Sequence, residues 1–231
     1  MKKKFVLGIL LVVFIGILYG CKKDNKYALE FKNEYEALNG LVNKNGKEHR
    51  TITVSEDNPY IKTTPEEIVK KIENKETFYL YVGDPLCPWC RSVLEKSIEV
   101  AKNSEVKKIY YIEIWDDEGT EILRDKYELQ ESKIVKTIEG TDSYKKLLEY
   151  FNSVLSEYNL TNEKGEKIST GEKRIYAPNY FYINDGIVKN MVEGISDKQK
   201  DSREELTEEM LEDEEKIFND FFVDYCYLDG C

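Results

Sequence analysis

Histidine is almost absent from this chain of 231 residues, since His49 is the only one. A cysteine–histidine hydrolase and a histidine-rich metal site both need imidazole groups, so the sequence supports neither class. His49 lies in a polar segment just before residues 50–54. We expect it to be an exposed residue without a functional role.

The chain also lacks an excess of positive charge. It has 34 Lys and Arg residues and 45 Asp and Glu residues, which gives a formal charge of −11. Without residues 1–20, which hold three of the lysines, the charge becomes −14. Such a surface repels nucleic acid and anionic lipid headgroups, so we expect no nucleic-acid partner.

The apolar run near the start is too short for a membrane span. It extends over the 16 residues of 5–20, whereas a span needs roughly 20. Three lysines precede it, which is typical of a secretory signal peptide over residues 1–20. Leu18, Gly20 and Cys21 then resemble a bacterial lipobox, with an unusual Tyr19 between them. The resemblance implies a lipid such as palmitate on Cys21 and a lipid-anchored position on the extracytoplasmic face of the cell membrane. An uncleaved anchor is the alternative.

Hydrophobic periodicity predicts strands that alternate with helices. The expected strands are 50–54, 77–82 and 106–115, and the expected helices lie within 22–40, at 63–74 and at 92–103. This β-α-β-α-β order implies a parallel sheet with right-handed crossovers. Further along we expect a mostly helical segment 116–160, a polar loop 161–174 that could hold a hairpin, a β-hairpin within 176–194 and a last helix over 203–225.

Two cysteines, Cys87 and Cys90, stand where a predicted strand passes into a helix. Pro88 suits the first helical position, which places Cys87 at the N-cap, the positive end of the helix dipole. The thiolate is stabilised there, so the pKa of Cys87 should fall. Cys90, one turn inside the helix, is suited to resolve a mixed disulfide. Trp89 between them should offer an exposed apolar contact for substrate.

A C-x-x-C pair can bind zinc, form a structural disulfide or exchange electrons. Zinc needs four ligands, and Cys226 with Cys231 would supply the others at an atypical spacing. A chain of this size can bury a core without relying on a disulfide. A strand, C-x-x-C and helix in a βαβ context favours redox exchange, so we expect no metal and no cofactor beyond the Cys87–Cys90 disulfide itself.

The strand, "CPWC" and helix, followed much later by "APNYFYINDGIVKNMVEG" and a terminal helix, resemble the thioredoxin fold. This α/β fold has a central mixed sheet flanked by helices, here over residues 51–225. The resemblance implies that Pro178 follows a cis bond and faces the cysteines, and that the backbone of Ala177 pairs with a bound substrate. The 88 residues from Cys90 to Pro178 exceed the roughly 40 that the fold needs. We therefore expect a helical insertion at about 116–175.

Three stretches of the sequence are similar to a Gram-positive lipoprotein group, the bacteriocin transport accessory proteins: "FKNEYEALNG", "LCPWCRSVLE" and "RIYAPNYFYINDG". The similarity implies a thiol–disulfide oxidoreductase that oxidises, reduces or isomerises disulfides of secreted cysteine-containing proteins or peptides, together with a membrane or extracytoplasmic redox partner. The alternative is a non-catalytic accessory module that docks a peptide for export or maturation. The intact C-P-W-C favours the enzyme.

The chain departs from the family at one position. Thioredoxins that act as strong reductants carry a buried acid six residues before the first cysteine, where this chain has Tyr81. We expect Asp84 in an exposed turn. Glu113 stands mid-strand and is either a substitute proton acceptor or a side chain that reaches solvent. The direction of electron flow is therefore open.

The tail of residues 226–231 holds the last two cysteines. An Asp-Gly turn lies between Cys226 and Cys231, and in an oxidising compartment we expect a second disulfide between them. It would act either as a clip on the C-terminus or as a relay for electrons to or from Cys87 and Cys90.

Overall fold

The computed structural model describes residues 26–116, 118–131 and 133–228, with the side chains of 223–228 left out. The expected signal peptide, the lipidation of Cys21 and the pairing of Cys226 with Cys231 fall outside the described parts. Among the described helices, none combines the length and the apolar character needed to cross a bilayer.

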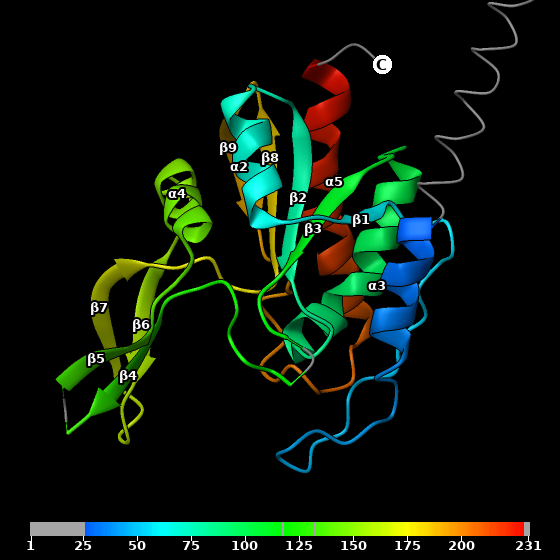
Figure 1. The fold of residues 1–231 in the computed structure, drawn as a ribbon. Coiled ribbons are helices and arrows are strands. Elements are labelled where there is room, and N and C mark those ends of the chain that lie inside the picture. Colours follow the sequence, from blue (N-terminus) through cyan, green and yellow to red (C-terminus); the bar gives the residue numbers. More distant parts are fainter. Residues whose placement is uncertain (1–25, 117, 132, 229–231) are drawn as a thin grey trace, which may run out of the picture.

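A five-stranded mixed sheet forms the centre of the molecule (Figure 1). Its strands in spatial order are β1 (Tyr60–Lys62), β3 (Ile109–Glu113), β2 (Phe78–Gly83), β8 (Asn179–Asn184) and β9 (Ile187–Val192). Strands β1 and β2 run parallel to β3, whereas β8 is antiparallel to β2 and to β9. The expected α/β class with a mixed sheet is confirmed.

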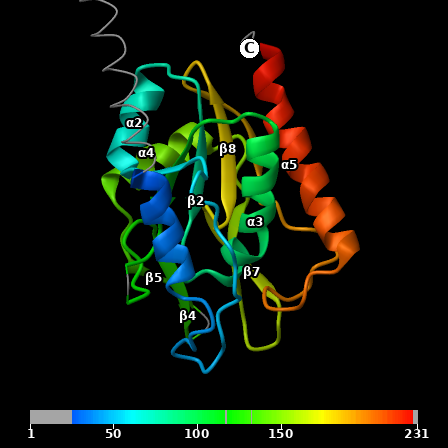
Figure 2. The same ribbon diagram turned by 90° about the vertical axis from the view of Figure 1, so that its right-hand side faces the viewer.

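Helices cover both faces of this sheet (Figures 1 and 2). Helices α2 (Pro65–Glu73) and α4 (Asp142–Phe151) pack together over one face, and α3 (Pro88–Asn103) and α5 (Glu208–Leu228) pack over the other. The helical segment 26–36 joins the second pair, because Phe31 and Tyr35 belong to the same core cluster as residues of α3 and α5. The core is therefore two layers separated by the sheet.

Local signals place α2 where the sequence predicts it. The Thr64 side chain caps the helix by accepting a hydrogen bond from the Glu67 N–H, and Pro65 takes the first helical position. Ile68, Val69 and Ile72 form its buried face.

The expected hairpin is confirmed, since β8 and β9 pair in antiparallel fashion. Asp185 and Gly186 both adopt positive φ angles in its turn.

The expected strand at 50–54 is wrong, and the edge strand is β1, in a segment expected to be a turn. Ile52 and Val54 are buried, which gives the segment its strand-like pattern. Their backbone N–H groups donate to side chains instead of a neighbouring strand: Ile52 to Asn39 Oδ1 at 3.1 Å and Val54 to Glu36 Oε1 at 2.8 Å. The segment is extended but belongs to no sheet.

The segment at 116–175 is not mostly helical as expected, although the hairpin that the loop 161–174 could hold is present. Two β-hairpins, β4 (Lys126–Gln130) with β5 (Lys133–Ile138) and β6 (Glu157–Thr161) with β7 (Lys167–Lys173), precede and follow α4. They form a lobe beside the central sheet (Figure 1). Among the described residues of this segment only α4 forms an α-helix, and Tyr144, Leu147 and Phe151 are its buried residues.

Candidate active site at the cysteine pair

The two cysteines lie at the junction of β2 and α3, as predicted. Cys87 is the N-cap of α3 and Pro88 its first residue. The Cys87 Sγ accepts a hydrogen bond from the Cys90 N–H at 3.4 Å. Both cysteines are free thiols, with 4% of Cys87 and none of Cys90 exposed. Of the two residues only Cys87 retains accessible surface.

The two thiols differ in acidity. The pKa of Cys87 is lowered by a hydrogen bond from the Cys90 thiol and by the backbone N–H groups of Cys90 and Trp89, against the opposing effect of burial. Burial and the Cys87 sulfur raise the pKa of Cys90 well above its ordinary value. This asymmetry gives Cys87 the properties of the attacking thiolate and Cys90 those of the thiol that acts second.

The loop before β8 brings Ala177 and Pro178 to the cysteines. The Ala177–Pro178 bond is cis, in accord with the resemblance. The Cys87 Sγ donates to the Ala177 carbonyl oxygen at 3.4 Å, across 90 residues of sequence. Asn179, which the sequence analysis missed, holds this loop because its Oδ1 accepts from the Tyr176 N–H at 2.8 Å. The nucleophile and a backbone segment capable of β-pairing therefore lie side by side.

The two tryptophans lie near the pair. Trp89 is half-buried and packs against the core, so its side chain is less exposed than we expected. Trp115, which the sequence analysis missed, follows β3 and packs against both core layers.

Asp84 does not lie in an exposed turn, because only 1% of it is accessible. Its Oδ1 accepts from the Leu86 N–H at 2.9 Å and its Oδ2 from the Trp115 N–H at 3.0 Å. Burial raises the pKa of Asp84 to about 7, although these hydrogen bonds oppose the rise. The carboxylate thus joins the loop before Cys87 to the segment after β3, a link that local sequence could not reveal.

Tyr81 lies on β2, six residues before Cys87. It is fully buried, and its hydroxyl lies 3.0 Å from the hydroxyl of Tyr35. Gly83 makes room for its ring, since a Cβ at that position would stand 2.1 Å from Tyr81 Cζ. Sequence analysis missed Gly83, although a glycine that ends a buried strand signals a close approach.

Glu113 lies at the end of β3 with 20% of its side chain exposed. Its Oε1 accepts a hydrogen bond from the Tyr111 hydroxyl at 3.2 Å, and its Oε2 pairs with Lys62 Nζ at 2.8 Å. Lys62 also pairs with Glu34 at 2.8 Å. Glu113, Asp84 and Glu34 line a cavity of about 270 Å³. Glu113 is therefore ion-paired and borders an open space, and its role as proton acceptor stays a prediction.

The segment before the cysteines is fixed by Arg91, another residue that sequence analysis missed. Its buried guanidinium donates to the carbonyls of Arg50, Tyr35 and Pro85 and to Asn39 Oδ1.

His49 is 5% exposed, so its expected exposure is wrong. Burial, with the nearby charge of Arg91, lowers the pKa of His49.

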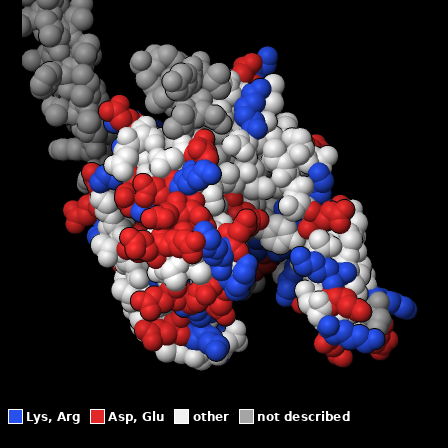
Figure 3. Space-filling view, turned by 180° about the vertical axis from the view of Figure 1, so that it is seen from behind, with Lys and Arg blue, Asp and Glu red and all other residues white. Residues whose placement is uncertain are grey.

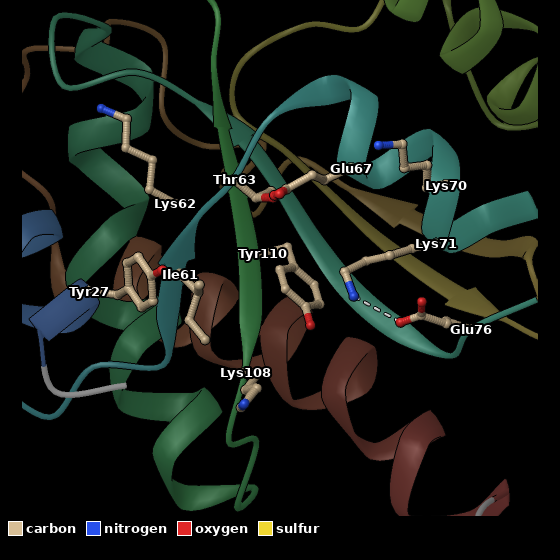
Figure 4. A pocket seen from close by; sticks show the side chains of 10 residues that line it. All are labelled: Tyr27, Ile61, Lys62, Thr63, Glu67, Lys70, Lys71, Glu76, Lys108 and Tyr110. Atoms are coloured by element: carbon tan, nitrogen blue, oxygen red, sulfur yellow. Dashed lines mark hydrogen bonds and ion pairs between the residues drawn. The ribbon is translucent and has the colours of Figure 1, made fainter. Parts of the chain in front are cut away.

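A second hollow lies away from the cysteines, along β1 and α2 (Figure 4). It measures about 590 Å³ and is lined by lysines and tyrosines, with a hydrogen-bonded ion pair of 2.8 Å between Lys71 and Glu76. Acidic side chains dominate the opposite face of the molecule (Figure 3). The first two turns of α5 carry four exposed carboxylates, those of Glu208, Glu209, Glu212 and Glu215.

Within residues 26–228, as far as their side chains are described, no three His, Cys, Asp or Glu residues are grouped as metal ligands. No protein-family model matches this chain, and no curated protein matches it either.

Proposed function

We propose that the chain is a thiol–disulfide oxidoreductase of the thioredoxin fold. One observation carries the proposal. The N-cap thiol of Cys87, whose pKa is lowered, stands 3.4 Å from the Ala177 carbonyl in the loop before Pro178. A reactive sulfur and a backbone segment able to pair with a peptide are thereby placed together.

The arrangement of elements supports the fold proposal. The sheet order β1-β3-β2-β8-β9 has three parallel strands followed by an antiparallel hairpin. The C-x-x-C opens the helix after β2, and the cis bond precedes β8. A thioredoxin fold combines these features, with the two hairpins and the segment before β1 as additions in this chain.

The reaction follows from the unequal thiols. The Cys87 thiolate attacks one sulfur of a substrate disulfide, forming a mixed disulfide and releasing the other sulfur as a thiolate. Cys90 then loses its proton and attacks Cys87 Sγ. The bond between Cys87 and the substrate breaks, and the electron pair leaves with the substrate sulfur. The substrate gains two electrons and the cysteine pair becomes a disulfide. The same steps in reverse oxidise a dithiol.

The proposed substrates are secreted proteins or peptides that contain cysteine. The carbonyl of Ala177 and its flanking backbone would hold an extended peptide next to Cys87, and Trp89 would contact it through its partly exposed ring. The anchor at Cys21 and the extracytoplasmic location are parts of this proposal that rest on the lipobox resemblance.

Trapping tests the proposal. The Cys90→Ser variant should accumulate mixed disulfides between Cys87 and cysteine-containing partners, whereas Cys87→Ser should accumulate few. Equal trapping by both variants, or none by either, would refute the enzymatic role. Peptide binding without trapping would favour an accessory module instead. The equilibrium reduction potential gives the direction, near about −270 mV for a reductant and about −120 mV for an oxidant.

A further inference from the structure

Three buried tyrosines form a file through the core layer that contains the cysteines. Tyr35 comes from the helix 26–36, Tyr81 from β2 and Tyr111 from β3, and none of them is exposed. The hydroxyls of Tyr35 and Tyr81 are 3.0 Å apart. The Tyr35 and Tyr111 hydroxyls also interact through a hydrogen bond that opposes the rise in the pKa of Tyr35. Packing alone would be met by phenylalanine, so the aligned hydroxyls require a further explanation.

The two ends of this file are a thiol and a carboxylate. At one end the Tyr81 hydroxyl hydrogen-bonds the Cys90 thiol and opposes the rise in its pKa. At the other end the Tyr111 hydroxyl donates to Glu113 Oε1 at 3.2 Å. The hydroxyls therefore connect a fully buried sulfur with a carboxylate that is 20% exposed.

We propose that the hydroxyls of Tyr81, Tyr35 and Tyr111 carry the proton of Cys90 to Glu113 when Cys90 attacks the mixed disulfide. This inference rests on the proposed oxidoreductase function and names the residues that complete its second step.

The need for such a path follows from the burial of Cys90. A thiol must lose its proton to act as a nucleophile, but a buried thiolate without a partner is costly. Tyr81 stands where a buried carboxylate would otherwise take the proton, and a phenol can take it only if it passes its own proton on. Each hydroxyl both donates and accepts one hydrogen bond, so a proton can be handed along without any tyrosine becoming charged. Burial raises the pKa of all three well above the ordinary value, which keeps them protonated.

The S–H bond of Cys90 breaks, its sulfur bonds to Cys87 Sγ, and the Cys87–substrate bond breaks with its electron pair going to the substrate sulfur. The proton enters the file at Tyr81, each hydroxyl transfers one proton to the next, and Glu113 becomes a carboxylic acid. Solvent in the adjoining cavity then takes the proton from Glu113. In the opposite direction the same file returns a proton to the Cys90 thiolate.

Glu113 suits the end of such a path. The Lys62 ammonium lies 2.8 Å from its carboxylate, and 20% of the side chain is exposed, so a proton that arrives there has a route to solvent. Asp84 is the competing acceptor, since it is buried beside the same cavity. Both of its oxygens already accept backbone hydrogen bonds, from Leu86 and Trp115, which gives it a bracing role.

The Tyr35→Phe variant of the full chain tests the path. The substitution keeps the ring and removes the middle one of the three hydroxyls. Cys21, Cys226 and Cys231 are replaced by serine in every protein compared, so that only Cys87 and Cys90 can react. The reduced protein is mixed with an excess of 5,5′-dithiobis(2-nitrobenzoate), and the release of the coloured thiol is followed in time. A first release reports attack by Cys87, and a second reports attack by Cys90 on the mixed disulfide.

We expect Tyr35→Phe to leave the first release unchanged and to slow the second by about 100-fold near pH 7, the lower end of what positioned proton transfer contributes. The slowing should shrink as pH rises, because hydroxide then removes the Cys90 proton directly. Glu113→Gln should show the same effect, and the double variant should be no slower than either single variant.

Tyr60→Phe is the matched control. Its ring belongs to the same core, but its hydroxyl bonds to Ser97 Oγ at 2.8 Å and to Tyr180 at 3.2 Å, outside the file. An unchanged second release in Tyr35→Phe and Glu113→Gln, or an equal slowing by Tyr60→Phe, would overturn the path. Slowing by Asp84→Asn but not by Glu113→Gln would overturn Glu113 as the acceptor. The absence of a second release from the wild-type protein would instead refute the oxidoreductase function. An unchanged first release shows that each variant is folded.

Discussion

Replacing Glu214 with glutamine should stabilise the folded protein, and the gain should grow as pH rises. Glu214 lies on α5 with no exposed surface, and neither of its carboxylate oxygens has a hydrogen-bond partner within the described residues. Burial raises its pKa from 4.5 to about 8, with the charges of Arg50 and Lys96 opposing the rise. An ionised Glu214 is therefore unfavourable in the folded state.

The sign follows from proton linkage. Between pH 4.5 and 8 the folded state holds a proton on Glu214 that the unfolded state has released, so the free energy of unfolding falls by about 1.4 kcal/mol per pH unit. From pH 5 to pH 7 the loss amounts to about 2.5 kcal/mol. A glutamine cannot ionise and removes this part of the slope. Its own unpartnered amide costs about 1–3 kcal/mol, but that cost does not depend on pH.

Urea denaturation followed by circular dichroism at pH 5, 6 and 7 measures this difference. Reductant should be present throughout so that the cysteines stay in one state. Glu215→Gln is the control, since it removes a carboxylate from the neighbouring position, where the side chain is half-exposed. The reasoning is refuted if the stability of Glu214→Gln runs parallel to that of the wild type between pH 5 and 7.

Two further predictions concern the cysteine site. In Cys90→Ala the pKa of Cys87 should rise, because the hydrogen bond from the Cys90 thiol is its first cause of lowering; the pH dependence of alkylation by iodoacetamide measures it, and an unchanged midpoint would show that helix N–H groups suffice. Gly83→Ala should destabilise the fold by about 1–3 kcal/mol in urea denaturation, since its Cβ would displace the Tyr81 ring and strain the core. It should also slow the second thiol release, and wild-type stability together with a wild-type second phase would contradict this account of the glycine.

Much of the site was predictable because its signals are local. Cys87 followed by Pro88 predicts a capped helix start, and the Asn-Asp-Gly sequence predicts the turn between β8 and β9. Both depend on backbone preferences within a few residues. The attacking and second-acting thiols follow from that helix start without knowledge of the rest of the chain.

The sequence-based predictions were wrong where groups distant in the sequence determine the local structure. Ile52 and Val54 have the alternation of a strand, but Asn39 and Glu36 satisfy their N–H groups. The local sequence around Asp84 is that of a turn. Its carboxylate is instead held by the Trp115 N–H, which lies 31 residues later in the chain. The charged segment 116–175 pairs with itself in two hairpins, and helix-compatible residues obscured the strands. No local pattern encodes these long-range partners.

The position of the tryptophans gives the chain a built-in optical signal. The sequence has two, and both adjoin the site: Trp89 lies between the cysteines, and the Trp115 backbone binds Asp84 in the loop before Cys87. A thiolate and a disulfide quench an adjacent indole to different extents, so oxidation of the pair should change the intrinsic fluorescence of the whole protein. With Trp115→Phe the emission comes from Trp89 alone, and each turnover can be followed without a label.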